Sequence, residues 1–517
     1  MKHTIQMAKL VIFATLFLLF TPFISAANIL AIFPLPSPSH HFWNSPLVVA
    51  LAKKGHNVTV VSQLPQLPPV PNVTDLVVEE LLARDHHFGY EEMVDAHPLT
   101  TVDAFLGLLG QSCLKIQKSD SWAKLLRYPT DTKFDLVIIE PMGAECLLGI
   151  LPRFGDPPII AVNAFNVPLW LFEMVGSPNM ISFMPHHHLA ATDRMSFTER
   201  LRNFYYTAYT YYYYHYDYLP RMDQAAKEFY GPHIPSFYKI RENVRLGMAN
   251  FHPILDYPYA KTPNLISVAG IQIQEPKPLS QDLKKFLDEA KEGAILVSFG
   301  SNIAFQHFAQ EKIKLFAEVF ASIPQRVLWK FEADKLPVQP ENIRIGKWLP
   351  QNDILAHRNV KLFITHAGLL SIHEAIYHGV PVIGIPIFAE QPMNIQKVIN
   401  HGAGISLNYN YLTKESFIEG IKTVLENSSF RDNIRVLSQV FKDDPQTPLE
   451  RAVFWTEYVL RHKGALHLQS AAKDLNIFQY FLLDIISFLV AVPLILFVVI
   501  YCVCCRRQSK KRKEKQH

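Results

Sequence analysis

Residues 363–391 read FITHAGLLSIHEAIYHGVPVIGIPIFAEQ, and this stretch decides the fold. Its first apolar run ends in Thr-His-Ala-Gly, and a short pattern of helical period then leads into a second apolar run. Strand, helix and strand in that order form a unit in which the two strands lie parallel. The helix then begins at the carboxyl end of the first strand, where its free N–H groups and positive dipole end favour an anion.

Small and polar residues occupy this predicted helix start at spacings that suit a phosphate group and a sugar. His366 can add a donor, and the small Ala367 and Gly368 let an anion approach the backbone closely. Ser371 can donate its hydroxyl, and Glu374 can accept hydrogen bonds from the two hydroxyls of a ribose. Taken singly, Ser371 and Glu374 also fit a capping box, and His366 fits a buried structural histidine.

The flanking residues extend this pattern in both directions. Glu390 and Gln391 follow the second strand, so they reach the same edge of the sheet and offer acceptor and amide groups to sugar hydroxyls. Upstream, Trp348 offers a flat face for a nucleobase, and Gln351 can reach the base edge. Base, ribose, diphosphate and sugar each have a partner, which favours a nucleotide-sugar site over a purely structural role.

Further apolar runs on both sides form two series of alternating strands and helices. The first series has strands at 28–33, 57–62, 134–140 and 157–162, with a loop and then a helical pattern at 46–54 after its first strand. The second has strands at 294–300, 326–331, 360–365 and 380–386, after a linker at 276–278. We therefore expect an α/β fold of two doubly wound domains facing a cleft. No GxGxxG follows the first strand, so a nicotinamide-binding domain is not indicated.

The two ends of the chain indicate a secretory, membrane-anchored protein. Residues 1–26 have the basic start, apolar run and small final residues of a signal peptide. Residues 485–505 carry no charge and are long enough to span a bilayer, and the basic tail 506–517 indicates a cytosolic end. Between these segments we expect an N-terminal domain at 27–278, a C-terminal domain at 279–445, and helices at 446–484 that pack back and lead to the membrane.

The formal charge of +4 comes from the ends of the chain. The tail contributes +6 and the signal +2, so the remaining body is negative and nucleic-acid binding is not indicated. Only Cys113 and Cys146 lie in this body, which allows at most one disulfide. Of the sequons at Asn57, Asn72 and Asn427, the first falls in a predicted strand, so we expect glycans at Asn72 and Asn427.

Two runs of unusual composition lie in the first half of the chain. We expect His186-His187-His188 to form a solvated loop rather than a metal site, because no further ligands are spaced to join it. Residues 204–218, FYYTAYTYYYYHYDY, would be aromatic on every side of a helix. This run suits packing together with an interfacial belt at the membrane, or alternatively a wall for apolar acceptors.

Residues 348–391, and nearly the whole chain with them, resemble the UDP-glycosyltransferases. The layout is similar to that of the membrane-bound animal members, and ILAIFPLPSPSHHF at 29–42 is most like the insect branch. The resemblance implies the two-domain fold called GT-B, a UDP-sugar bound in the C-terminal half, and sugar transfer to small lipophilic acceptors. The donor roles that it implies are uracil stacking for Trp348, diphosphate contacts for Ser301, His366 and Ser371, ribose binding for Glu374, and sugar binding for Glu390 and Gln391.

The catalytic base must lie elsewhere, because the acceptor hydroxyl loses a proton as it attacks. Ser39-His40-His41 lies in the predicted loop after the first strand, and a histidine is largely neutral at working pH. The family's Ser-His motif aligns with His40, and His41 is the competitor. Where the family has an aspartate that orients the base, Glu140 ends the strand FDLVIIE, and Glu145 is the alternative. We expect inversion in one displacement and, without Asp-x-Asp at a strand end, no metal requirement and no cofactor beyond the UDP-sugar.

Three residues depart from the family pattern, namely Ala367 for glycine, His373 for glutamine and Glu390 for aspartate. A methyl group at Ala367 requires ordinary backbone angles, which a helix start allows. Glucose is expected over glucuronate, because no cation is adjacent to Glu390 in the sequence. The alternative from another class is a membrane-anchored lipophile-binding protein without turnover.

The tail also carries a location signal. Its lysines at 513 and 515 resemble a dilysine retrieval signal, so we expect a single-pass type I protein of the endoplasmic reticulum membrane with lumenal domains. The oligomeric state, homo-oligomers included, is left open by the sequence.

Overall fold

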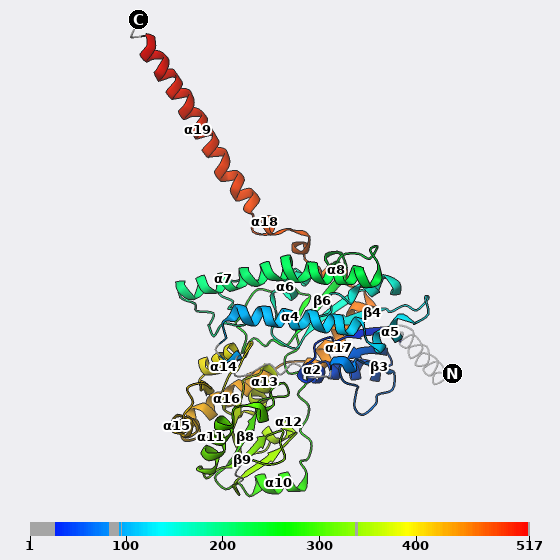
Figure 1. The fold of residues 1–517 in the computed structure, drawn as a ribbon, viewed down its shortest axis with the longest axis vertical. Helices are drawn as coiled ribbons and strands as arrows, with labels where there is room; N and C mark the ends of the chain where they lie inside the picture. Colours follow the sequence, from blue (N-terminus) through cyan, green and yellow to red (C-terminus); the bar gives the residue numbers. More distant parts are fainter. Residues whose placement is uncertain (1–25, 82–92, 95, 337–339, 515–517) are drawn as a thin grey trace, which may run out of the picture. The chain divides into compact units, whose positions relative to one another are not determined.

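The computed structural model describes residues 26–81, 93–94, 96–336 and 340–514 (Figure 1). The predicted signal peptide, 1–26, lies outside these residues except for Ala26. Contacts divide the chain into two compact units, Met1–Leu468 and Gln469–His517. Both β-sheets belong to the first unit.

Two parallel sheets organise the first unit. Their strand orders are β3-β2-β1-β4-β5-β6-β7 and β10-β9-β8-β11-β12-β13. Each order reverses at a central pair, β1 beside β4 in one sheet and β8 beside β11 in the other. In doubly wound folds, the loops after such a pair open a crevice for a ligand at the carboxyl ends of the strands.

The strands of the first sheet are β1 (Asn28–Ile32), β2 (Asn57–Ser62), β3 (Val73–Val77), β4 (Leu136–Ile139), β5 (Ile159–Asn163), β6 (Val244–Ala249) and β7 (Leu265–Ser267). Those of the second are β8 (Ala294–Ser298), β9 (Arg326–Lys330), β10 (Ile343–Gly346), β11 (Val360–Thr365), β12 (Val382–Gly384) and β13 (Gly404–Ser406). Strands β4 and β8 are buried along their whole length, because helices cover both faces of each sheet.

The α-helices are numbered in chain order. Those of the first half are α2 (Pro38–Lys53), α4 (Pro98–Gln117), α5 (Asp120–Leu126), α6 (Leu169–Val175), α7 (Phe197–Tyr213), α8 (Leu219–Tyr230) and α9 (Phe237–Ile240). The later ones are α10 (Gln281–Asp288), α11 (Gln310–Ala321), α12 (Gln351–Leu355), α13 (Leu369–His378), α14 (Gln391–Asn400), α15 (Lys414–Glu426), α16 (Ser428–Lys442), α17 (Pro448–Arg461), α18 (Ile477–Tyr480) and α19 (Leu483–Glu514). In Figure 1, α4 and α7 run alongside each other, and their residues are in contact.

Each of the eight predicted strand runs contains a strand, and the predicted two-domain α/β fold is confirmed. The start of the first helix is wrong. Helix α2 begins at Pro38, not near Pro46, because proline at the first helical position has the required φ and lacks only an N–H that would be free there. His40 and His41 therefore lie in the first turn of α2 rather than in a loop.

After the second sheet the chain returns to the first. Helix α17 packs against α2, where Ala452 and Val453 join the apolar cluster beneath β1. Lys54 and Glu457 add an ion pair of 3.1 Å between the same elements. In the second unit, α19 contains a stretch, Leu483–Gln508, that is long and apolar enough to cross a membrane.

The tyrosine-rich run forms the end of α7 and a π-helical turn at Tyr214–Tyr218, and α8 follows directly. Tyr214 and Tyr218 are buried, whereas Tyr205 and Tyr212 are more than half exposed. None of the described residues that line the cavity between the carboxyl ends of the two sheets comes from 204–218, which argues for the packing interpretation and against the acceptor wall.

Candidate active site

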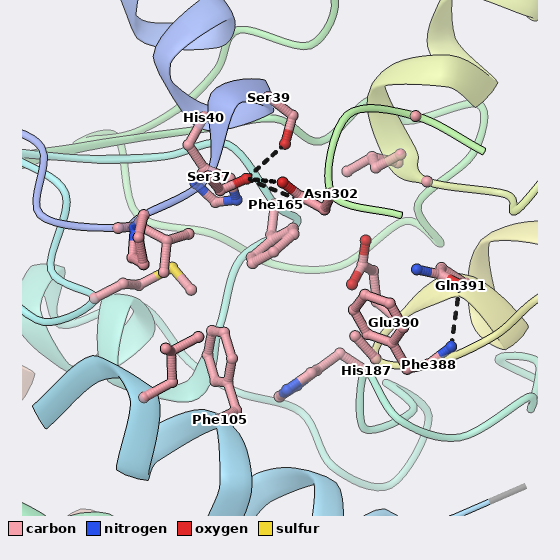
Figure 2. A pocket seen from close by; sticks show the side chains of 18 of the residues that line it. Ser37, Ser39, His40, Phe105, Phe165, His187, Asn302, Phe388, Glu390 and Gln391 are labelled. Atoms are coloured by element: carbon pink, nitrogen blue, oxygen red, sulfur yellow. Dashed lines mark hydrogen bonds between the residues drawn. The ribbon is translucent and has the colours of Figure 1, made fainter. Parts of the chain in front are cut away.

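A cavity of about 270 Å³ lies between the carboxyl ends of the two sheets (Figure 2). Segments that follow β1, β4 and β5 line one side, segments that follow β8, β11 and β12 line the other, and α4 adds an apolar wall. Seven predicted site residues line the cavity, namely His40, Ser301, His366, Gly368, Ser371, Glu390 and Gln391. Glu140, Trp348, Gln351 and Glu374 lie behind or beside it.

His40 and Glu140 form a buried pair at the cavity wall. His40 Nδ1 lies 2.5 Å from Glu140 Oε1, and the two residues are 2% and 0% exposed. Glu140 also accepts hydrogen bonds from Asn44 Nδ2 at 3.2 Å and from the backbone N–H of Ala164 at 3.4 Å. Because the carboxylate engages Nδ1–H, the basic lone pair of His40 is on Nε2. Phe165 packs edge-on against the imidazole, with centroids 4.5 Å apart, and fixes its plane.

The two competing residues are engaged elsewhere. His41 is hydrogen-bonded to the backbone of Pro65, and burial lowers its pKa. Glu145 is fully buried, accepts a hydrogen bond of 2.9 Å from Tyr218 and one of 3.0 Å from the N–H of Gly143, and its pKa is raised by burial. The structure therefore brings Glu140, and not Glu145, to His40.

The start of α13 has the features of an anion site. Its first backbone hydrogen bond runs from the N–H of Ile372 to Gly368, so the preceding amides of the helix have no helical partner. The ring of His366 lies between two glycines, where a Cβ at Gly300 or Gly368 would lie 2.7 Å or 2.5 Å from it. Burial lowers the pKa of His366 to about 3, so the ring is neutral and can donate one hydrogen bond.

The expectation of ordinary backbone angles at Ala367 is wrong. Its φ is +64°, in the left-handed region, because the chain turns sharply between β11 and the N-cap Gly368. A non-glycine residue there costs about 1–2 kcal/mol. The second departure, His373, is completely buried and packs against Phe441 at 5.4 Å, and burial lowers its pKa to about 3.

The predicted ribose and base residues form a separate group beside the cavity. Gln351 Nε2 donates to Ser371 Oγ at 3.1 Å and to Glu374 Oε2 at 2.9 Å, and no capping box forms at α13. Burial raises the pKa of Glu374 to about 7. Trp348 is 61% exposed, and Phe42 from α2 lies 5.5 Å from its ring. An indole so exposed beside a polar cluster is available for stacking.

Glu390 and Gln391 lie where β12 leads into α14 (Figure 2). Gln391 Oε1 accepts hydrogen bonds from the N–H groups of Ile387 at 2.8 Å and Phe388 at 3.1 Å, which leaves its Nε2 to donate to a ligand. Burial raises the pKa of Glu390, while the nearby His40 is among the groups that oppose this shift. The Glu390 carboxylate thus faces the base across the cavity.

Two features of the cavity were not predicted from the sequence. Ser37 and Asn302 exchange hydrogen bonds of 3.1 and 2.9 Å, which join the start of α2 to the loop after β8. The prediction of a solvated loop at 186–188 is wrong: His186 is 7% exposed, and His187 and His188 line the cavity. Burial lowers the pKa of His187 to about 4. Asn302 directly follows the predicted residue Ser301, and this position in the sequence was the only signal that could have identified Asn302 as a site residue.

The sequence analysis also made predictions about the cysteines and about metal binding. Cys113 and Cys146 form a disulfide, within the predicted limit of one, and it ties α4 to the segment after β4. In the part of the chain that the structure describes, no group of three or more His, Cys, Asp or Glu side chains is arranged to hold a metal ion.

Comparison with known proteins agrees with this geometry. A family model described as "UDP-glucoronosyl and UDP-glucosyl transferase" matches residues 75–517. "UDP-glucosyltransferase 2" of Dactylopius coccus is 37% identical over 489 residues, which cover 93% of this chain and 92% of that protein. "UDP-glucuronosyltransferase 2B33" of Macaca mulatta is 31% identical over 499 residues, which cover 92% of this chain and 93% of that protein.

Solved structures of several glycosyltransferases resemble this fold. The calicheamicin glycosyltransferase CalG4 aligns with a TM-score of 0.56 at 17% identity and covers 85% of this chain and 99% of that chain. At this identity the likeness concerns the fold alone, which is GT-B. With the family match over most of its length, the chain belongs to the UDP-glucuronosyl and UDP-glucosyl transferases and is a hexosyltransferase.

Proposed function

We propose that the protein transfers glucose from UDP-glucose to a hydroxyl of a small lipophilic acceptor, with inversion at the anomeric carbon and His40 as general base. The observation that carries this proposal is the buried His40–Glu140 pair, whose histidine lines the same cavity as the open start of α13. A base and an anion site on opposite sides of one cavity are what an in-line displacement from a nucleotide sugar requires.

The steps follow from these positions. His40 Nε2 accepts the acceptor's proton as its oxygen forms a bond to the anomeric carbon. The bond from that carbon to the β-phosphate oxygen breaks, and its electron pair leaves with UDP. Glu140 stabilises the imidazolium that forms. The free amides of α13, with His366 and Ser301, stabilise the charge that grows on the diphosphate.

The rest of the donor extends from this point along the second sheet. Uracil stacks on Trp348, and the ribose hydroxyls bind Glu374, which Gln351 holds in place. Glu390 and the free amide of Gln391 bind the sugar hydroxyls. No metal or other cofactor takes part in this scheme.

The choice of glucose rests on charge. A glucuronate carboxylate would lie near the Glu390 carboxylate, and like charges repel at that range. The nearest buried ammonium, Lys397, is already paired with Asp256 at 2.5 Å. Glucose brings only hydroxyl groups to the same position.

The setting proposed for this reaction is the lumen of the endoplasmic reticulum. The apolar stretch of α19 and the animal relatives support a membrane anchor, and the basic residues that follow the stretch support a cytosolic tail. Asn72 and Asn427 are exposed, as glycan acceptors must be.

A donor competition assay tests the proposal. Membranes containing the full chain are given UDP-glucose and UDP-glucuronate together with a phenol panel, and the products are identified by mass and by the anomeric proton coupling. The proposal predicts β-glucosides in excess over glucuronides. Glucuronides as the main product would overturn the sugar assignment, and α-linked products would overturn the inverting mechanism.

A further inference from the structure

The cavity that holds the proposed reaction is unevenly charged. Among its described lining residues, Lys115 is the only lysine or arginine and Glu390 is the only carboxylate. Burial lowers the pKa of His187 to about 4 and that of His366 to about 3, so these rings add no positive charge near pH 7. The one fixed cation and the one fixed anion belong to opposite halves of the molecule.

Helix α4 places Lys115 far from the reacting centre. One stripe of this helix lines the cavity, namely Thr101, Ala104, Phe105, Leu108, Gln111, Ser112 and Lys115. Phe105 marks the reacting end, because its ring lies 6.4 Å from that of Phe165, which in turn contacts His40. Lys115 is ten residues farther along the helix, which corresponds to about 15 Å.

In the part of the chain that the structure describes, the ammonium of Lys115 makes no hydrogen bond and no ion pair. The polar Gln111 and Ser112 lie one turn before it on the cavity side of α4, and the apolar Leu108 and Phe105 follow toward the reacting end. A charged group that lines a cavity gains from a partner of opposite charge, since the surroundings screen that pair less than bulk water does.

We propose that the natural acceptor is an elongated, anionic lipophile that carries a carboxylate or a similar oxyanion at the end opposite the hydroxyl that receives the sugar. This inference rests on the proposed function and deepens it. Lys115 binds the oxyanion, Phe105 and Leu108 of α4 contact the apolar body, and the hydroxyl reaches His40. Glu390 repels the oxyanion from the sugar end, so the molecule enters in one orientation only.

A matched pair of acceptors tests the proposal on the full chain in detergent. The probes are 4′-hydroxystilbene-4-carboxylate and its methyl ester, which differ in charge but share the reacting phenol. The acid is expected to have a KM about tenfold lower than the ester, as a charged hydrogen bond implies. Lys115→Gln should abolish this preference by raising KM for the acid more than KM for the ester, and Lys115→Glu should reverse it.

Lys118→Gln is the control, because it removes the same charge from the end of the same helix but lies outside the described cavity lining. It should keep the preference for the acid. A second control is 4-hydroxybenzoate, which is too short to reach Lys115, so its KM should not respond to Lys115→Gln.

Different results would exclude the anionic acceptor and the proposed glucosyltransferase activity. If the wild-type enzyme glucosylates the ester as readily as the acid, or if Lys115→Gln and Lys118→Gln have equal effects, the anionic acceptor is excluded while the glucosyltransferase stands. If neither probe nor any phenol receives glucose, although UDP binds, the proposed function itself fails.

Discussion

The raised pKa of Glu374 makes donor binding dependent on pH in a way that can be calculated. Burial raises this pKa to about 7, so about a tenth of the carboxyl groups are ionised at pH 6 and about nine-tenths at pH 8. Only the carboxylate can accept hydrogen bonds from both ribose hydroxyls. The affinity for UDP should therefore rise by up to about tenfold from pH 6 to pH 8.

Isothermal titration of the full chain with UDP measures this change. The terminal phosphate of UDP also gains charge in this range, so the comparison with Glu374→Gln isolates the protein's share. That variant should bind UDP more weakly at pH 8 and show a smaller pH dependence than the wild type. Glu390→Gln is the matched control, because UDP lacks the hexose that this residue is proposed to bind, and it should behave as wild type.

The same group should affect stability with the opposite sign. The folded state keeps the Glu374 proton up to about pH 7, whereas the unfolded chain loses it near 4.5, so stability falls as pH rises between these values. The full loss amounts to at most about 3 kcal/mol. Glu374→Gln should unfold at a higher denaturant concentration than wild type at pH 8. A wild-type UDP affinity that is flat or falls from pH 6 to pH 8, or a variant that matches it throughout, would refute this reasoning.

Three further predictions concern the connections around the cavity. Ser37→Ala removes the hydrogen bonds to Asn302 that hold the start of α2, so kcat should fall several-fold while the affinity for UDP stays constant. If the affinity for UDP, measured by titration, fell by the same factor as kcat, the prediction would be contradicted. Gly300→Ala places a Cβ 2.7 Å from a histidine ring at a φ of +75°, so UDP should bind at least about tenfold more weakly, and calorimetry showing wild-type affinity would exclude the anion site. Replacing Cys113 and Cys146 by serine opens a link between residues 33 apart, so the free energy of unfolding should fall by about 4 kcal/mol in urea titrations. A double variant whose free energy of unfolding equals that of the oxidised wild type would contradict this role of the disulfide.

The sequence predicted the fold because the central strands are continuous apolar runs. Strand β4, which is buried throughout, and strand β11, which is buried except at Lys361, were found with ends shifted by at most two residues. The edge strands gave no such signal: β3 carries Asp75, and β10 is mostly half-buried and carries Arg344. Their pairing depends on the neighbouring strand more than on their own composition.

The site could be predicted in part for a similar reason. Residues that directly follow a central strand, such as His366 and Glu140, reach the crevice whatever their neighbours are. The pairing of His40 with Glu140, 100 residues apart, depends on β1 lying beside β4, which is a property of the strand order. The left-handed angle at Ala367 was missed because it arises from the tight connection between strand and helix and not from alanine itself.

The central claim, that His40 is the base, is tested most directly by comparing His40→Ala with its neighbour His41→Ala under saturating UDP-glucose and one phenol. His40→Ala should bind UDP normally and lose about 10²–10⁴-fold in glucoside formation, the usual contribution of a general base. His41→Ala should keep most of its activity, because that ring is hydrogen-bonded to the backbone of Pro65. Turnover that survives in His40→Ala, with UDP bound, would contradict the account.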